Sequence, residues 1–209
     1  MEKSRSKPLT RIQKISRNLI VEAAIDVFAE QGFSGATLDR IADHAEMSKT
    51  NLLYYYKSKS ELYHATIEAT LDIWLDSLAR LDPNGEPEEE LRRYIREKIE
   101  FSRDNPTASR LFANEILHGA DRSKDILKRR LKVLMDEQSK ALRSWMRAGK
   151  IAKVDPYNMI FTIFGATQTF ADFAAQIDIV TGNSLDDRRY YNQVARDLEQ
   201  LLLNGIIPR

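Results

Sequence analysis

The sequence predicts an all-helical protein. Only 8 glycines and 6 prolines occur among 209 residues, while charged residues make up 30% of the chain. Apolar residues recur at helical spacing along the whole chain, and no alternating strand pattern competes with them. This composition, with few β-branched valines, favours helices over sheets. The length allows one or two domains with a substantial core.

Several classes of protein are excluded by residues that the chain lacks. It has no apolar run long enough to span a bilayer and no cleavable leader, so we expect a cytoplasmic protein without membrane contact. Without cysteine there are no disulfides, thiol nucleophiles or thiolate ligands. His44, His64 and His118 are too widely spaced for a metal site. We expect no cofactor and no enzyme activity, since phosphate loops and nucleophile elbows are also missing.

The first predicted helix covers about residues 10–31. Gly32 follows it, at a position where glycine commonly ends a helix. One apolar stripe along this helix consists of Ile20, Ala23, Ala24, Val27 and Phe28. The stripe indicates a helix that packs with one side on a small core.

Residues 37–59 predict two short helices joined by a tight turn. Thr37 is a favourable N-cap for the first of them, and Ser48 for the second. The apolar face of the first short helix consists of Leu38, Ile41, Ala42 and Ala45. Their spacing places all four on one side of the helix.

The second short helix presents hydrogen-bonding side chains on its first turn. Lys49, Thr50 and Asn51 follow directly after the capping Ser48. A helix that enters the major groove of DNA contacts base edges with its N-terminal residues. The pair of helices therefore predicts a helix-turn-helix that binds double-stranded DNA.

The distribution of charge supports this interpretation, although the net charge is only +1. Residues 1–17 contain six basic side chains and one acid, and residues 47–59 contain three lysines and no acid. Residues 18–46 contain one arginine against six acids. The two basic blocks are candidates for phosphate contact. By itself the first block could equally be a solvated tail, and we expect residues 1–10 to form a disordered basic arm.

Four further boundaries can be located in the rest of the chain. Ser58-Lys59-Ser60-Glu61 is a capping box that starts a fourth helix, which ends before a turn at residues 82–85. Asn105-Pro106 and Asp155-Pro156 place proline at the first position of later helices. The remaining predicted helices cover about residues 88–103, 105–119, 124–148, 156–182 and 185–204. Nine helices are therefore expected.

The last two predicted helices are unusually apolar. The helix at residues 156–182 is apolar on most sides, and such a helix must be buried on most sides. The final helix carries a second apolar face, formed by Leu198, Leu201 and Leu202. A large monomeric core would explain this, but we favour a homodimer through these two helices because a small chain rarely covers such a surface. Two-fold dimers also place two recognition helices one DNA turn apart.

The chain resembles the TetR/AcrR family of bacterial transcription regulators over about residues 11–62. The family pattern T-x-x-x-I-A, a turn, then S-K-x-x-L-Y-Y-x-F-x-S-K-x-x-L is matched by TLDRIA and SKTNLLYYYKSKSEL. Two positions depart from it: Glu46 replaces a turn glycine, and Tyr56 replaces a core phenylalanine. A non-glycine residue in a left-handed turn costs about 1–2 kcal/mol, so this turn should be either slightly strained or differently shaped.

The resemblance implies the domain organisation and the regulatory role. Residues 11–58 would form the DNA-binding domain, with the helix-turn-helix at 37–56, and residues 59–209 would bind an effector and dimerise. The protein would be a repressor that a small molecule releases from its operator. An alternative is an adaptor or architectural protein that uses the same helix-turn-helix without an effector.

Seven residues are candidates for DNA contact. Thr50 and Asn51 suit base edges, and Lys49 suits a phosphate or a guanine. Two tyrosines of the same helix suit phosphates through their hydroxyls, unless one packs on the first helix. Two more residues start helices, whose N–H groups favour phosphate. The full set is Thr37, Lys49, Thr50, Asn51, Tyr54, Tyr55 and Lys59.

The later segments LDIWL, SRDNPTASRLF and ATQTFADFAAQIDIVTG resemble the pyrimidine-utilisation regulators within this family. That resemblance implies an effector such as uracil or thymine, and it suggests a pocket with Trp74, Phe164, Gln168 and Phe170. A buried Gln168 needs hydrogen-bond partners, which a pyrimidine, a neighbouring helix or the dimer mate could supply. Asp172, one turn later, could orient Gln168 or pair with an arginine.

Overall fold

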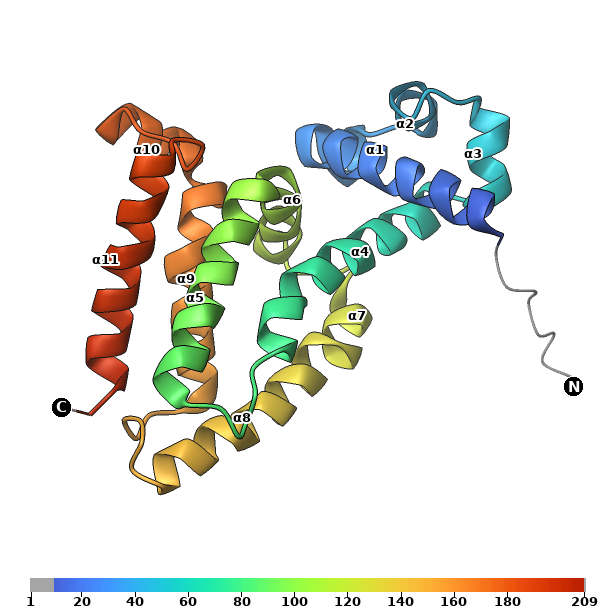
Figure 1. Cartoon of the computed structure of the whole chain (residues 1–209). Helices are drawn as coiled ribbons and strands as arrows, with labels where there is room; N and C mark the ends of the chain where they lie inside the picture. The colour runs from blue at the N-terminus through green and yellow to red at the C-terminus, as the bar shows by residue number, and fades with distance from the viewer. Residues whose placement is uncertain (1–9, 209) are drawn as a thin grey trace, which may run out of the picture. The chain divides into compact units, whose positions relative to one another are not determined.

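The computed structural model describes residues 10–208, and over this range the chain is helical without any strand (Figure 1). The predicted all-helical class is confirmed. The expected basic arm at residues 1–10 lies, apart from Thr10, outside the described residues. The helices are α1 (Arg11–Gly35), α2 (Leu38–His44), α3 (Lys49–Tyr55), α4 (Lys59–Ala79), α5 (Pro87–Asp104), α6 (Pro106–Leu117), α7 (Lys124–Arg129), α8 (Leu131–Arg147), α9 (Pro156–Asp172), α10 (Ala174–Thr181) and α11 (Arg188–Ile206).

The chain divides into two compact units, Met1–Ala69 and Thr70–Arg209. The division falls inside α4, which is a single helix with residues in both units. From the sequence we placed the boundary at residue 59, where α4 begins. None of the helices in the described part of the chain is long and apolar enough to cross a membrane.

The first unit is built on the apolar stripe of α1. All five predicted stripe residues are buried, and Gly32 interrupts the helix with a φ of 66° rather than ending it. Ile41 of α2 and Leu52 of α3 are fully buried in the same unit. Phe28 packs edge-on against Tyr63 of α4, with ring centroids 4.9 Å apart. A small core of apolar side chains thus holds the two short helices, which would not be stable alone.

The turn between α2 and α3 is left-handed at Glu46, whose φ is 53°. The Met47 N–H donates to the Ala42 carbonyl at 2.9 Å, and the Glu46 N–H donates to the Asp43 carbonyl at 3.1 Å. These bonds close the C-terminus of α2 in the manner that normally employs glycine. The strain expected from the sequence at this position is therefore present in the backbone.

We expect Glu46→Gly to raise the free energy of unfolding of the first unit by about 0.5–1 kcal/mol. Glycine removes the cost of about 1–2 kcal/mol for a left-handed residue but adds entropy to the unfolded chain. Urea denaturation measures the difference. Glu46→Ala is the matched control, because it removes the charge and keeps the Cβ atom. Equal stabilisation by both variants would show that the charge, not the backbone, is responsible.

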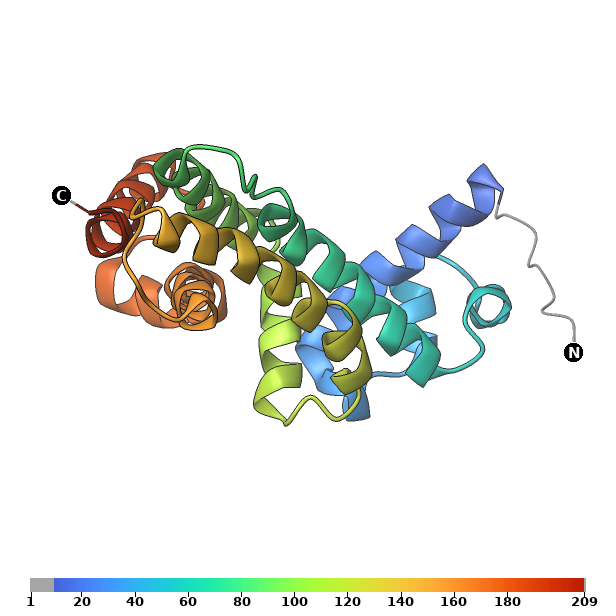
Figure 2. The same cartoon turned by 90° about the horizontal axis from the view of Figure 1, so that it is seen from below.

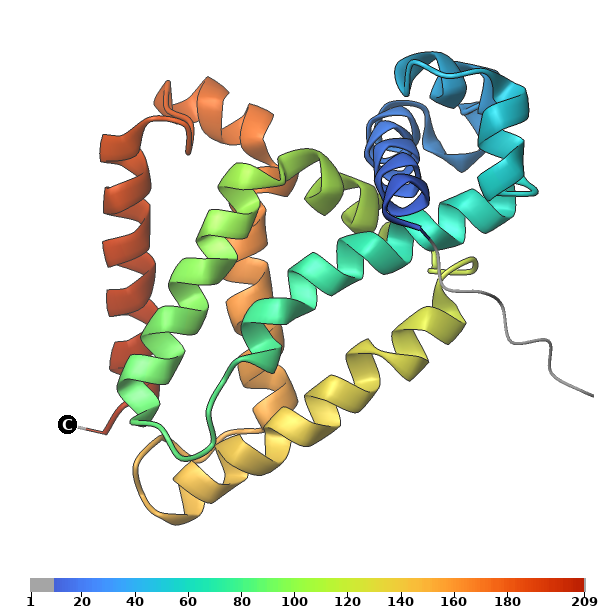
Figure 3. The same ribbon diagram turned by 45° about the vertical axis from the view of Figure 1, so that its right-hand side comes forward.

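The second unit is organised around α9. This helix contacts α5, α6, α8, α10 and α11, and α5 also contacts α11 along its length. Figure 2 shows α9 nearly end-on with α5, α8 and α11 around it, and Figure 3 shows α5, α9 and α11 side by side. The buried residues of α9 are Pro156, Met159, Ile160, Ile163, Phe164, Thr167 and Ala171. Phe161, Phe164 and Gln168 of this helix line a cavity of the unit.

Two predicted helices are each broken into two, which gives eleven helices in the described chain instead of nine. The predicted helix 124–148 breaks at Arg130, with φ −115° and ψ −65°. The predicted helix 156–182 breaks at Phe173, with φ −115° and ψ 28°. Neither break has a glycine or proline to mark it in the sequence. Within the single chain α9 has seven buried residues and α10 has none, so the burial expected for residues 156–182 is reached only in the α9 part.

Candidate DNA-binding surface and effector pocket

The recognition helix α3 is fixed from both ends. The Ser48 hydroxyl accepts the Asn51 N–H at 3.2 Å, which caps the helix as predicted. Leu52 is fully buried and Tyr56 is 2% exposed, so the inner side of the helix is anchored in the core. Arg17 lies 4.6 Å from the Tyr56 ring centroid, and burial raises the pKa of this phenol against the opposing effect of Arg17. Leu53, next to the buried Leu52, is only half-buried.

The first turn of α3 is exposed and offers donors and acceptors. The Thr50 hydroxyl makes no hydrogen bond to any residue that the structure describes. The Asn51 amide lies 4.0 Å from the Met47 sulfur, a weak contact. The Lys49 ammonium is 2.8 Å from a carboxylate oxygen of Asp39 on α2. Both partners of this ion pair are about half exposed, so it holds the lysine only loosely.

The two tyrosines of α3 differ in environment. Tyr54 is 60% exposed, and its hydroxyl accepts a hydrogen bond from Gln13 of α1 at 3.3 Å. Tyr55 is half-buried and packs edge-on against Tyr54, with centroids 5.1 Å apart. Tyr54 therefore presents its hydroxyl at the surface where α1 and α3 meet.

The two residues at helix N-termini are engaged within the first unit. The Thr37 hydroxyl accepts the Arg40 N–H at 3.2 Å and caps α2. The Lys59 ammonium donates to the Ala36 carbonyl at 3.0 Å and lies 4.7 Å from the Phe33 ring centroid. These contacts tie the start of α4 to the connection before α2. The backbone N–H of Lys59, at the start of a helix, is a further donor that a phosphate could use.

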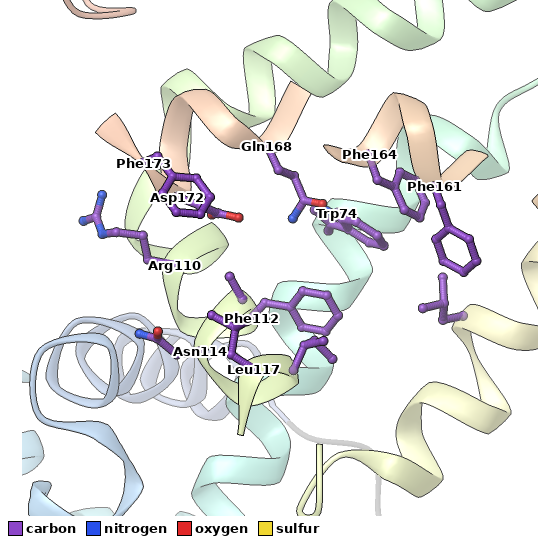
Figure 4. Close-up of a pocket in the computed structure, with 13 residues that line it drawn as sticks. Trp74, Arg110, Phe112, Asn114, Leu117, Phe161, Phe164, Gln168, Asp172 and Phe173 are labelled. Carbon is purple, nitrogen blue, oxygen red and sulfur yellow. The ribbon is translucent and has the colours of Figure 1, made fainter. Parts of the chain in front are cut away.

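A cavity of about 510 Å³ lies in the second unit, between α4, α6, α8 and α9 (Figure 4). Its walls are mainly aromatic and aliphatic. The aromatic lining residues are Trp74, Phe112, Phe161, Phe164 and Phe173. The polar lining residues are Arg110, Asn114, Gln168 and Asp172. A largely apolar cavity with a few polar groups is the usual form of a site for a small organic ligand.

Three of the four predicted pocket residues meet at this cavity. The Trp74 ring lies 4.2 Å from the Phe164 centroid, and Gln168 stands one turn further along α9. Phe170 does not belong to the set, because two residues along a helix turn a side chain to the opposite side. Phe170 instead lines a separate cavity with Arg103 and Tyr190, among others.

Phe112 completes the aromatic wall and was not predicted from the sequence. Its ring centroid is 5.3 Å from that of Trp74. The residue lies in the segment SRDNPTASRLF, to which the sequence pattern assigned no pocket role. Only the packing of α6 against α9 brings it to the cavity.

Gln168 and Asp172 extend from one face of α9 into the cavity (Figure 4). The Gln168 carboxamide makes no hydrogen bond within the described chain. Asp172 is held by the buried Ser109, whose hydroxyl donates to its Oδ1 at 2.7 Å. Burial raises the pKa of Asp172, and the Ser109 hydrogen bond, Arg110 and Lys98 oppose this rise.

Lys98 of α5 lies behind the aromatic wall and is completely buried. Its ammonium nitrogen is 3.8 Å from the Trp74 ring centroid and 3.4 Å from the Trp74 carbonyl oxygen. Burial lowers the pKa of Lys98 well below its ordinary value, and the charge of Asp172 only partly opposes this. Its place between Ile95 and Ile99 on the apolar face of α5 was a visible signal that we did not use. No group of acids and histidines in the described chain is arranged to hold a metal ion.

The fold and the two sites define a helix-turn-helix DNA-binding protein with a ligand cavity. The family model of bacterial regulatory proteins of the TetR family matches residues 20–66, and the model of the C-terminal region of YcdC-like proteins matches residues 67–209. The chain therefore belongs to the TetR family, whose members are transcriptional regulators that bind operator DNA and not enzymes. This confirms the family resemblance seen in the sequence.

Individual relatives support the same conclusion. The HTH-type transcriptional regulator RutR of Escherichia coli K12 is 43% identical over 200 residues, which cover 96% of this chain and 94% of RutR. A TetR-like transcriptional regulator from Rhodococcus sp. RHA1 has 26% identity and a TM-score of 0.66, with 95% and 98% of the two chains covered. AibR, solved with isovaleryl coenzyme A and operator DNA, has 21% identity and a TM-score of 0.69, with 89% and 97% covered.

Proposed function

We propose that the protein is a repressor that leaves its operator when a pyrimidine base such as uracil or thymine fills the cavity of the second unit. The observation that carries this is the unpaired carboxamide of Gln168 on an aromatic wall. A pyrimidine presents an N–H next to a C=O, and this pair complements a carboxamide. Its flat ring matches the aromatic faces of Trp74, Phe112 and Phe164.

The cavity also favours an effector-responsive regulator over an adaptor. A protein that only localises a partner on DNA needs no cavity, and a filled second unit would have supported that alternative. The volume of about 510 Å³ lies within the range of ordinary small-molecule sites. AibR, which has the same fold, was solved with both a small molecule and operator DNA, so this architecture accommodates both partners.

Helix α4 offers a physical link between the two activities. It runs without interruption from Lys59 in the first unit to Trp74 and beyond in the second. In a dimer, the two recognition helices must match half-sites about 34–36 Å apart. An effector can shift that spacing only by binding the non-matching state more tightly than the DNA-bound state.

The dimer that this mechanism requires is proposed to form through α9, α10 and α11. Support comes from the apolar side chains that these helices leave exposed: Phe173, Ile179, Val180 and Leu201, which are 56%, 83%, 75% and 72% exposed. Apolar surface of this extent on a soluble regulator usually marks an interface.

A gel-shift titration tests the proposal. Operator DNA is held at a concentration where about half is bound, and uracil, thymine, cytosine and adenine are added separately. We expect uracil or thymine to release the DNA, with adenine as the control for non-specific effects. If no base weakens binding at any concentration, the pyrimidine response is wrong. If only an unrelated metabolite releases the DNA, the protein is still a ligand-responsive repressor, but its effector is not a pyrimidine.

Within α3, we propose that Thr50 and Asn51 contact base edges, and that Lys49, Tyr54 and Tyr55 contact phosphates. Support comes from the exposure of the first turn and from the free Thr50 hydroxyl. Thr37 and Lys59 are proposed to contact phosphates through the N-termini of α2 and α4. Contacts to phosphate position the protein, whereas contacts to bases select the sequence.

We expect Asn51→Ala to weaken operator binding by about 10- to 100-fold while leaving binding to unrelated DNA unchanged, because a good base contact contributes about 1–3 kcal/mol of discrimination. Fluorescence anisotropy with operator and scrambled duplexes measures both. Tyr54→Phe is the matched comparison, since loss of a phosphate contact should weaken both duplexes alike. An unchanged ratio of affinities in Asn51→Ala would remove this residue from base recognition.

A further inference from the structure

The polar groups of the cavity have a defined donor and acceptor pattern. The Gln168 carboxamide has an N–H donor and a C=O acceptor, and both are unpaired in the described chain. Asp172 follows one helical turn later on the same face of α9, and both side chains enter the cavity in Figure 4. An ionised carboxylate only accepts hydrogen bonds.

The buried Ser109 determines which carboxylate oxygen of Asp172 can accept a hydrogen bond from a ligand. Its hydroxyl donates to Oδ1 at 2.7 Å and is itself fully enclosed, so the carboxylate cannot rotate without losing this bond. Among residues 10–208, no side chain or backbone N–H donates a hydrogen bond to the second oxygen, Oδ2. The Arg110 guanidinium points away from the carboxylate in Figure 4 and donates to the Thr107 hydroxyl at 3.3 Å. One acceptor of Asp172 is thus left for a ligand.

We propose that the cavity recognises an unsubstituted cyclic ureide edge, –NH–CO–NH–, and that Asp172 is the residue that requires the second N–H. Gln168 pairs with one N–H and the central C=O, and Asp172 accepts the other N–H. This deepens the proposed pyrimidine response and rests on it. The ring lies against Trp74 and Phe112, whose centroids are 5.3 Å apart.

Recognition of the ureide edge predicts that some planar bases bind and others do not, whereas aromatic stacking alone would accept all of them. Uracil and thymine present the full edge. Cytosine lacks the N–H at N3, and a nucleoside lacks the N–H at N1, so each leaves one acceptor of the site unpaired. A buried acceptor without a donor is costly, and more so when it is charged. Dihydrouracil keeps the edge although its ring is not aromatic, so it should also bind.

Isothermal titration calorimetry on the full chain tests the assignment. The ligands are uracil, dihydrouracil, 1-methyluracil and 3-methyluracil, and the variants are Asp172→Asn and the control Asp125→Asn on the exposed start of α7. We expect wild type to bind uracil and dihydrouracil, and to bind either methyl derivative about tenfold or more weakly. Asp172→Asn should bind uracil more weakly than wild type by a similar factor, and Asp125→Asn should bind it with wild-type affinity.

The possible outcomes separate this inference from the proposed function. If wild type binds uracil and both methyl derivatives equally, or if Asp172→Asn binds uracil like wild type, the ureide assignment is overturned while the pyrimidine response stands. If none of the four ligands binds wild type, the pyrimidine response fails and the ureide edge with it. Should Asp172→Asn not fold, the methyl derivatives on wild type decide the question without a variant.

Discussion

Replacing Lys98 by methionine should raise the free energy of unfolding by about 1–4 kcal/mol, the range found when buried ion pairs are exchanged for apolar residues of similar volume. Lys98 is completely buried and no carboxylate lies within ion-pair distance of its ammonium among the described residues. Its favourable contacts are the Trp74 ring at 3.8 Å, the Trp74 carbonyl at 3.4 Å, and the more distant rings of Phe164 and Phe101 at 5.1 and 5.3 Å. A desolvated cation–π contact contributes about 2 kcal/mol, less than the several kcal/mol that burial of the charge costs.

The buried Lys98 also makes the stability of the wild-type protein depend on pH. The pKa of Lys98 lies well below the ordinary 10.5 in the folded protein, because burial disfavours the charged form. Between the two values the unfolded chain binds the proton and the folded chain does not, so stability rises with pH across that interval. Below the pKa that Lys98 has in the folded protein, Lys98 is protonated in both the folded and the unfolded state. Its contribution to the free energy of unfolding is then constant and at its most unfavourable value.

Urea denaturation at several pH values between 6 and about 10 measures both effects. Lys98→Met should be more stable than wild type and should lose the rise with pH, and Lys140→Met, at an exposed position of α8, should show neither change. A less stable Lys98→Met with unchanged pH dependence would mean that the ammonium stabilises the wall through Trp74.

The features of the first unit that sequence reasoning located are local. Thr37 and Ser48 cap the helices at which they were placed, and Glu46 adopts the left-handed conformation that a missing glycine suggested. Caps and turns depend on a few neighbouring residues, so a single sequence contains the necessary information. Half of the capping box predicted at Ser58 is also present: the Ser58 hydroxyl accepts the Glu61 N–H at the start of α4, whereas the Glu61 carboxylate accepts the N–H of Lys57 instead of that of Ser58.

The second unit was harder to predict because its details come from packing between distant segments. The break at Phe173 has no glycine or proline, and it separates the buried α9 from the exposed α10. Phe170 was assigned to the pocket by the family resemblance, whereas the helix turns it to another cavity. Ser109 and Phe112 reach the site only because α6 packs on α9. Such contacts leave no signature in local spacing.

Gln168→Met should leave the folded protein as stable as wild type or more stable, and should make the repressor insensitive to its effector. The carboxamide has no partner in the described chain, so a side chain of the same length without hydrogen-bonding groups loses nothing on folding. The effector, by contrast, loses its bidentate contact. We expect its affinity to fall about 10- to 100-fold, which corresponds to one well-placed pair of hydrogen bonds.

Thermal unfolding and the gel-shift titration together distinguish the three partners that the sequence left open for Gln168. If the amide binds the effector, melting is unchanged, operator binding is retained, and release requires at least tenfold more ligand than in wild type. If it instead bonds a neighbouring helix or the dimer mate, Gln168→Met should be less stable by about 1–3 kcal/mol, because the partner would be left unpaired. Gln176→Met, on the exposed face of α10, is the matched control and should change neither property. A destabilised variant that releases DNA at wild-type ligand concentrations would assign Gln168 to the scaffold rather than to the pocket.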